Sequence, residues 1–218
     1  MILEMLGDMP VAVGGRDQFL SAFIRCYGEC RDLYSDQEFA TDVWPRWDSF
    51  FFRCKRSEAL RSESVISKVA FALGLEYWDG EPLRLDGVLY SKEEVVERGF
   101  PFPIMVAFEH EEDPRGFQNE IMKLLSVRCP LKVGITHTIT ERTGPNFLER
   151  LADHRDTIRT KIAEKFRRIE AVNREDPRTE YLFLIGCQER QKDPVWYFLS
   201  FTAGSGPGDQ NFERIEEC

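Results

Sequence analysis

The sequence predicts an α/β protein in which a mixed β-sheet is flanked by helices. Residues 102–111 form a nearly continuous apolar run that ends in acids, which is typical of a central strand buried on both faces. Amphipathic helical patterns alternate with strand-like segments after residue 57. No repeat or linker divides the 218 residues, a length that suits a single domain. The predicted order from residue 57 is therefore helix, three strands, helix, strand, helix and two strands.

Composition excludes several classes of protein. Hydrophobic residues make up 42% and charged residues 31%, which indicates a folded chain rather than a disordered one. No apolar run approaches the roughly 20 residues of a membrane span, and the acidic start lacks the basic region of a secretory signal. The six cysteines form no CxxC pair, which favours reduced thiols in a cytoplasmic protein. A net charge of −9 argues against a histone-like binder but permits a nuclease whose basic residues line a groove.

The elements of the first two thirds are predicted from local patterns. Residues 1–56 form a helical extension, and residues 57–138 form the core of the domain. The core begins with a helix over 57–73 that Gly74 ends. The Asp79-Gly80 step predicts a hairpin. The remaining segments are strands at 75–78 and 83–90, a short charged helix at 91–98, and the buried strand at 102–111.

The second half continues the alternation. Asp113 and Pro114 are typical of a helix start, and the apolar residues that follow them lie on one helical face. Residues 139–218 are expected to hold a long helix, a hairpin and a loose tail that starts at GSGPGDQ. The expected segments are a strand at 131–138, a long amphipathic helix at 145–172, and two strands around a turn at 188–194.

Three acids occupy predicted strands, where burial is costly unless they have a partner. Asp86 interrupts the apolar residues of the hairpin, and Glu109 and Glu111 project to one face because they lie two apart. If Asp86 faces the same way, the three carboxylates repel one another unless a cation lies between them. Hard oxygen ligands suit Mg²⁺ or Mn²⁺. The alternative is that all three acids face solvent at strand ends.

This order of elements resembles the core of the PD-(D/E)xK nuclease superfamily, the restriction-endonuclease-like fold. The matching residues are Asp86 in LRLDGVLY and Glu109 in MVAFEHE, followed by the helix FQNEIMKLL and the strand LKVGIT. The match covers roughly residues 57–138. It implies a nuclease that hydrolyses phosphodiester bonds, in which Asp86 and Glu109, with Glu111, hold Mg²⁺ or Mn²⁺ to activate water.

The sequence departs from the family pattern at one position. The usual lysine two residues after the second acid is replaced by Glu111. Lys123 on the following helix is the candidate for a relocated lysine, although helical geometry turns it towards solvent. Glu120 is a candidate additional ligand, and the alternative for both is a surface ion pair. The family's acid from the first helix corresponds to Glu63 (or, less well, Glu58).

The expected partner is nucleic acid, with DNA as the first expectation and no membrane. A homodimer or a protein partner stays open. Basic residues on the long helix are candidates for contact with the nucleic-acid backbone, against the alternative of a solvated helix face. These candidates are Arg155, Arg159, Lys161, Lys165 and Arg168.

Competing hypotheses remain. Glu111 at the lysine position also fits a non-catalytic nuclease-fold protein that acts as a binding or regulatory module. An unrelated α/β interaction domain stays open if Asp86 and Glu109 are distant. His110 is expected on the opposite face of its strand, as a core residue or as a support for the site. A zinc site of His110, Glu111 and His137, or a nucleophilic pair of Cys129 and His137, has no spacing in its favour.

Overall fold

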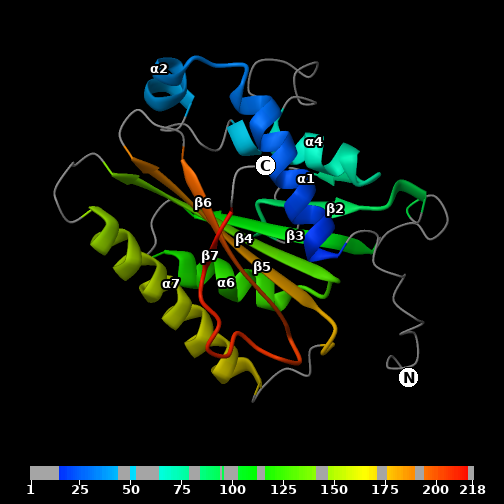
Figure 1. Cartoon of the computed structure of the whole chain (residues 1–218). Coiled ribbons are helices and arrows are strands. Elements are labelled where there is room, and N and C mark those ends of the chain that lie inside the picture. The colour runs from blue at the N-terminus through cyan, green and yellow to red at the C-terminus, as the bar shows by residue number, and fades with distance from the viewer. Residues whose placement is uncertain are drawn as a thin grey trace.

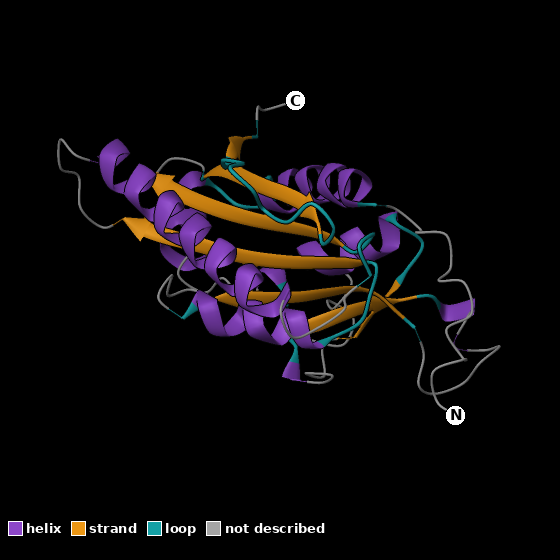
Figure 2. Ribbon diagram, turned by 90° about the horizontal axis from the view of Figure 1, so that it is seen from below, coloured by secondary structure: helices purple, strands orange, loops and turns teal. Residues whose placement is uncertain are grey.

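The computed structural model of the chain describes residues 15–43, 50–52, 64–78, 84–93, 95, 103–111, 116–140, 147–170, 176–189 and 194–215. Within these residues, a seven-stranded mixed sheet lies between two layers of helices (Figures 1 and 2). The predicted α/β class, with a mixed sheet flanked by helices, is confirmed. None of the helices in this part of the chain is both long and apolar enough to cross a bilayer.

The strands lie in the sheet in the order in which they occur in the sequence. β3 pairs with β4 and β4 with β5 in parallel, whereas the outer pairs are antiparallel. The carboxyl ends of the three parallel strands therefore meet at one edge of the sheet. The bounds are β1 Glu76–Trp78, β2 Gly87–Tyr90, β3 Ile104–Glu111, β4 Leu131–Thr140, β5 Glu180–Glu189, β6 Val195–Thr202 and β7 Glu213–Arg214.

The helices divide between the two faces of the sheet. Figure 1 shows α1 and α4 on one face and α6 and α7 on the other. The bounds are α1 Arg16–Arg31, α2 Asp36–Glu38, the π-helix η1 Phe39–Val43, α4 Val65–Ala72, α6 Phe117–Ser126 and α7 Phe147–Glu170. The parallel strands are connected by helices of the second face: α6 lies between β3 and β4, and α7 lies between β4 and β5.

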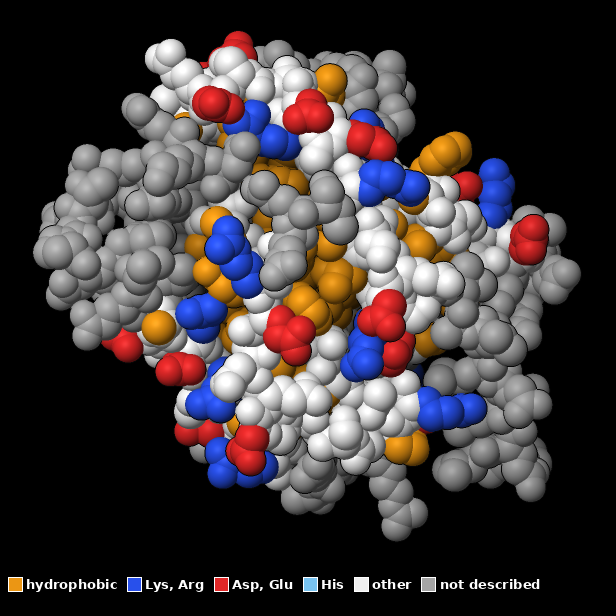
Figure 3. Space-filling model, in the orientation of Figure 1, with side chains coloured by type: hydrophobic (Ala, Val, Ile, Leu, Met, Phe, Trp, Pro, Cys, Tyr) orange, Lys and Arg blue, Asp and Glu red, His pale blue; other side chains and the backbone are white. Residues whose placement is uncertain are grey.

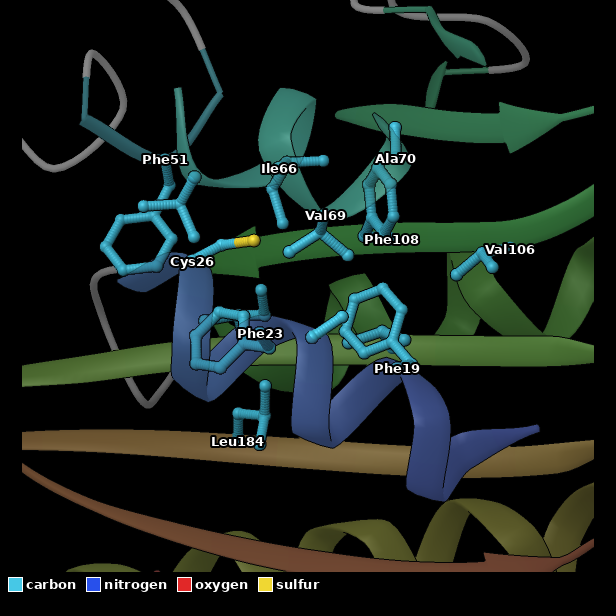
Figure 4. Packing of buried hydrophobic residues seen from close by; sticks show 14 of the residues in the cluster. Phe19, Phe23, Cys26, Phe51, Ile66, Val69, Ala70, Val106, Phe108 and Leu184 are labelled. Atoms are coloured by element: carbon cyan, nitrogen blue, oxygen red, sulfur yellow. The ribbon is translucent and has the colours of Figure 1, made fainter. Parts of the chain in front are cut away.

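The first face has an aromatic core (Figure 4). Phe19 and Phe23 of α1 are fully buried and pack with Val69 of α4 and Phe108 of β3. Phe23 also meets Trp196 of β6 edge to face, with ring centroids 5.1 Å apart. The helical extension predicted at the N-terminus thus contributes α1 to the core, where its aromatic side chains are buried.

The second face is built from the apolar stripes of α6 and α7. Phe117 and Ile121 of α6 are almost completely buried, and so are Ile158 and Ile162 of α7. The spacing of four residues places each pair on one side of its helix. Tyr181 of β5 lies in the same cluster. This packing fixes α6 over the sheet and so determines where its polar side chains can reach.

Several predicted boundaries differ from the structure. The predicted helix 57–73 is described from its N-cap, Ser64, whose hydroxyl accepts a hydrogen bond from the Ser67 backbone. β1 and β2 pair antiparallel as predicted, but β2 starts at Gly87 because Arg84 has a left-handed φ of 66° that interrupts the strand. The turn at 79–80 and most of the predicted helix 91–98 lie outside the described residues.

The start of α6 also differs. Its N-cap is Gly116, with no side-chain cap, so the helix begins later than the predicted start at Asp113 and Pro114, which lie outside the described residues. α7 and the strands β4, β5 and β6 agree with their predicted segments within a few residues. The tail that was expected to be loose contributes β7, whose two residues pair with Tyr197 and Phe198 of β6.

Candidate metal site

Three carboxylates from three different elements converge beside the second face of the sheet. Asp86 lies immediately before β2, Glu109 lies on β3 and Glu120 lies on α6. One carboxylate oxygen from each residue lies within 4.8 Å of the others. Asp86 and Glu109, which lie 23 positions apart in the sequence, therefore share one site with Glu120 of the next helix.

The backbone around β2 positions Asp86. Its Oδ2 accepts a hydrogen bond of 2.7 Å from the backbone N–H of His110 on β3. Gly87 allows the aromatic rings of Tyr77 and Phe108 to approach closely, since a Cβ at residue 87 would lie 2.6 and 2.8 Å from them. The absence of a side chain at Gly87 therefore helps to hold Asp86 against the end of β3.

Glu109 is the most deeply buried member of the group, with 0% of its surface exposed. It alternates with Phe108 and His110, so it faces α6 while those two residues face α1 and α4. α6 presents Glu120 and Lys123 one helical turn apart. The ammonium of Lys123 lies 3.2 Å from Glu109 Oε2 and forms an ion pair with Glu120. One lysine thus bridges two of the three carboxylates.

The pKa values follow from this burial and crowding. The pKa of Glu109 is raised to about 10, mostly by burial and further by the hydrogen bond to Glu120 and the charges of Asp86 and Glu120. Lys123 opposes this rise but does not cancel it. Burial alone would lower the pKa of Lys123, yet its hydrogen bonds and attraction to Glu120 and Glu109 raise it above its ordinary value. Without a metal ion, Glu109 therefore carries a proton at neutral pH.

The donor set fits a hard divalent cation. Glu109 Oε1 is shielded from solvent, and apart from the hydrogen bond between Glu109 and Glu120 no described group pairs with it. That hydrogen bond depends on the proton of Glu109, and a cation that displaces the proton would take its place between the two carboxylates. Carboxylate oxygens from Asp86, Glu109 and Glu120 suit Mg²⁺ or Mn²⁺ better than softer metals.

The structure brings together four of the predicted site residues and leaves others apart. Asp86, Glu109, Glu120 and Lys123 are in contact or close to one another. Lys123 lies partly towards solvent, as its helix position predicts, with 37% of its side chain exposed, but its ammonium reaches back to Glu109. Glu111 ends β3 and is not a member of the three-carboxylate group. Glu63 and Glu58 lie outside the described residues.

The two histidines form a pair on the opposite face. His110 Nε2 lies 3.1 Å from His137 Nδ1, and both side chains are buried. Glu111, next to His110 in β3, projects to the other face of the sheet. The zinc site considered from the sequence, made of His110, Glu111 and His137, is therefore not assembled on one face. Cys129 precedes β4 and His137 lies far along it, which separates the proposed nucleophilic pair.

The basic residues predicted on α7 do not all lie on one side of the helix. Arg155 places its guanidinium 4.3 Å from the centre of the Tyr197 ring, and Arg159 ion-pairs with Asp156 at 3.8 Å. Lys161 and Lys165 lie elsewhere on the helix surface, and the side chain of Arg168 lies outside the described part.

Comparisons with protein-family models, curated proteins and solved structures find no match to this chain. The functional interpretation therefore depends on the site itself. Sequence reasoning missed one residue that bears on it. Gly87 positions Asp86, and the Asp-Gly step before an apolar strand is the signal that could have identified it. Arg167, one of the basic residues of the long helix, lines a groove beside α7.

Proposed function

We propose that the chain is a nuclease that uses a divalent metal ion to hydrolyse phosphodiester bonds in nucleic acid, with DNA as the expected substrate. The observation that carries this proposal is the convergence of Asp86, Glu109 and Glu120 with the ammonium of Lys123. Buried carboxylates on a strand, with a lysine beside them, are the groups that such chemistry requires.

The order of elements supports the same proposal. α4, the antiparallel pair β1 and β2, the strand β3, the helix α6 and the parallel strand β4 follow one another. This order agrees with the nuclease core that the sequence resembles. If the chain has this nuclease core, Lys123 on α6 supplies the amino group of the usual lysine, whose position on β3 is occupied by Glu111.

Each residue then has a distinct chemical task. Asp86, Glu109 and Glu120 would hold Mg²⁺ or Mn²⁺, which would activate water and stabilise negative charge during phosphodiester hydrolysis. The His110 backbone N–H orients Asp86 so that its carboxylate faces the site. Lys123 places a positive charge where charge develops on the phosphate oxygens. The apolar packing of α6 keeps Glu120 and Lys123 in place relative to β3.

Cleavage of plasmid DNA and of single-stranded DNA in Mg²⁺ or Mn²⁺ tests this function. We expect Asp86→Ala and Lys123→Ala to lose about 100-fold or more of the wild-type rate, because each removes charge at the reacting centre. Asp32→Asn is a matched control, since this exposed carboxylate lies at the end of α1 across the sheet. Equal rates in wild type and both site variants, or no cleavage by wild type, would contradict the proposal.

A further inference from the structure

A groove runs between α7 and the segment that follows β6. It consists of two adjoining hollows of about 450 Å³ each, which share Arg159. One hollow adds Arg167 and the turn at residues 205–209, and the other adds Arg155 and Phe212. We call this feature the arginine groove, after Arg155, Arg159 and Arg167.

Two of the three guanidinium groups are held by contacts within the chain, and the third lies beside a carboxylate with its Nε left without an acceptor. Arg155 lies over the Tyr197 ring, and Arg167 Nε donates a hydrogen bond of 3.3 Å to the Ala163 carbonyl. Arg159 Nε is shielded from solvent and has no hydrogen-bond acceptor among the described residues, with Asp156 Oδ1 3.8 Å away. Guanidinium groups that are already ordered lose little entropy when they bind an anion, and their geometry matches phosphate oxygens.

The spacing of the arginines fits a chain of anions better than a single anion. Arg159 and Arg167 follow Arg155 by four and twelve residues, which correspond to about 6 and 18 Å along a helix axis. The turn opposite them permits close approach, since Gly208 has a φ of +50° and nothing lies within 4 Å of where its Cβ would be. Phe212, which is partly buried, offers an apolar ring beside the charges.

We infer that the arginine groove binds the phosphodiester backbone of a single strand of nucleic acid. The groove also contains Asp156 and Asp209, so it has three positive and two negative side chains in a chain of net charge −9. Figure 3 likewise shows Lys and Arg mixed with Asp and Glu on the face that it displays, rather than a continuous basic band. Binding thus depends on the guanidinium groups, with the partly buried ring of Phe212 beside them for contact with a base.

The location of the groove connects it with the candidate metal site. α6, which carries Glu120 and Lys123, packs against α7 on the same face of the sheet. A strand held along α7 is therefore on the face from which the candidate metal site is built. The substrate role of this strand rests on the proposed nuclease function, whereas binding itself does not.

Fluorescence anisotropy of a labelled oligothymidylate, measured in EDTA so that cleavage cannot occur, tests the inference. We expect the Arg155→Ala/Arg159→Ala/Arg167→Ala variant to bind at least about tenfold more weakly than wild type. The slope of log affinity against log salt concentration should decrease by about two for three lost phosphate contacts. The charge-matched control replaces Arg25, Lys92 and Arg128 by Ala, which are exposed and lie off α7; its affinity should stay close to that of wild type.

Two further variants keep the test decisive if the triple variant does not fold. Arg159→Lys retains the charge but loses the planar donor pair, and should weaken binding. Asp209→Asn removes a negative charge from the groove and should strengthen it. Equal losses in the groove and control variants, unchanged binding in Arg159→Lys and Asp209→Asn, or equally good competition by polyglutamate would overturn the inference. If Asp86→Ala loses nuclease activity but binds the oligothymidylate as wild type does, the arginine groove is supported. A failure of the nuclease proposal can thus be distinguished from a failure of the groove.

Discussion

At the scale of single residues, ionisation of Glu109 is strongly opposed by its surroundings. Its pKa rises to about 10 in the folded chain, mainly through burial, whereas an unfolded chain ionises it near 4.5. Between these two values the folded state binds one more proton than the unfolded state. The free energy of unfolding is therefore highest at acid pH, where both states are protonated. It falls by up to about 1.4 kcal/mol per pH unit as the pH rises between the two pKa values.

Glu109→Gln should therefore change the pH dependence of stability. The amide keeps the shape of the side chain but cannot ionise, so the variant should gain stability relative to wild type as the pH rises from about 5 to 9 in EDTA. Below the unfolded pKa the difference should no longer change with pH. Urea unfolding at a series of pH values measures it. A difference between variant and wild type that is the same at every pH would contradict the account of Glu109.

At the scale of elements, the link between β2 and β3 determines whether Asp86 reaches the site. Gly87→Ala would place a Cβ 2.6 Å from the Tyr77 ring and 2.8 Å from the Phe108 ring, and both rings are packed in the core of the first face. We expect a loss of about 1–3 kcal/mol of unfolding free energy from this crowding. Thermal or urea unfolding checks the loss, with Gly28→Ala as the control because nothing lies within 4 Å of its Cβ position. Equal stability in Gly87→Ala and wild type would show that the close approach is unimportant.

Local patterns were sufficient for most elements but not for their assembly. The apolar run of β3 and the amphipathic stripe of α7 identify those elements because burial on two faces or on one side leaves a clear period. The late start of β2 at Gly87 could not be predicted from the sequence, since nothing in the local pattern indicates that Arg84 has a left-handed φ. Asp86 and Glu109 were identified as polar interruptions of apolar strands. The contact of Lys123 with Glu109 depends on how α6 packs over the sheet, which the local pattern does not specify.

At the scale of the whole molecule, both proposals use one face of the sheet. The candidate metal site lies between β2, β3 and α6, and the arginine groove lies along α7, which packs against α6. The opposite face is filled by the aromatic core of α1 and α4. On the two proposals, a chain of net charge −9 would approach nucleic acid through positive charges that are confined to particular positions on this face.

The central claim is that Asp86, Glu109 and Glu120 hold a divalent cation, and thermal unfolding with and without Mn²⁺ tests it most directly. Mn²⁺ at about 100 times its dissociation constant should stabilise wild type by about 2.7 kcal/mol, visible as a rise in Tm. At one fixed Mn²⁺ concentration the rise should be larger at pH 8 than at pH 6, since binding displaces the proton of Glu109 and is therefore tighter at higher pH. Asp86→Ala/Glu109→Ala should lose the response, and the control Asp32→Asn should keep it. No rise in wild type, or an equal rise in the double variant, would contradict the claim.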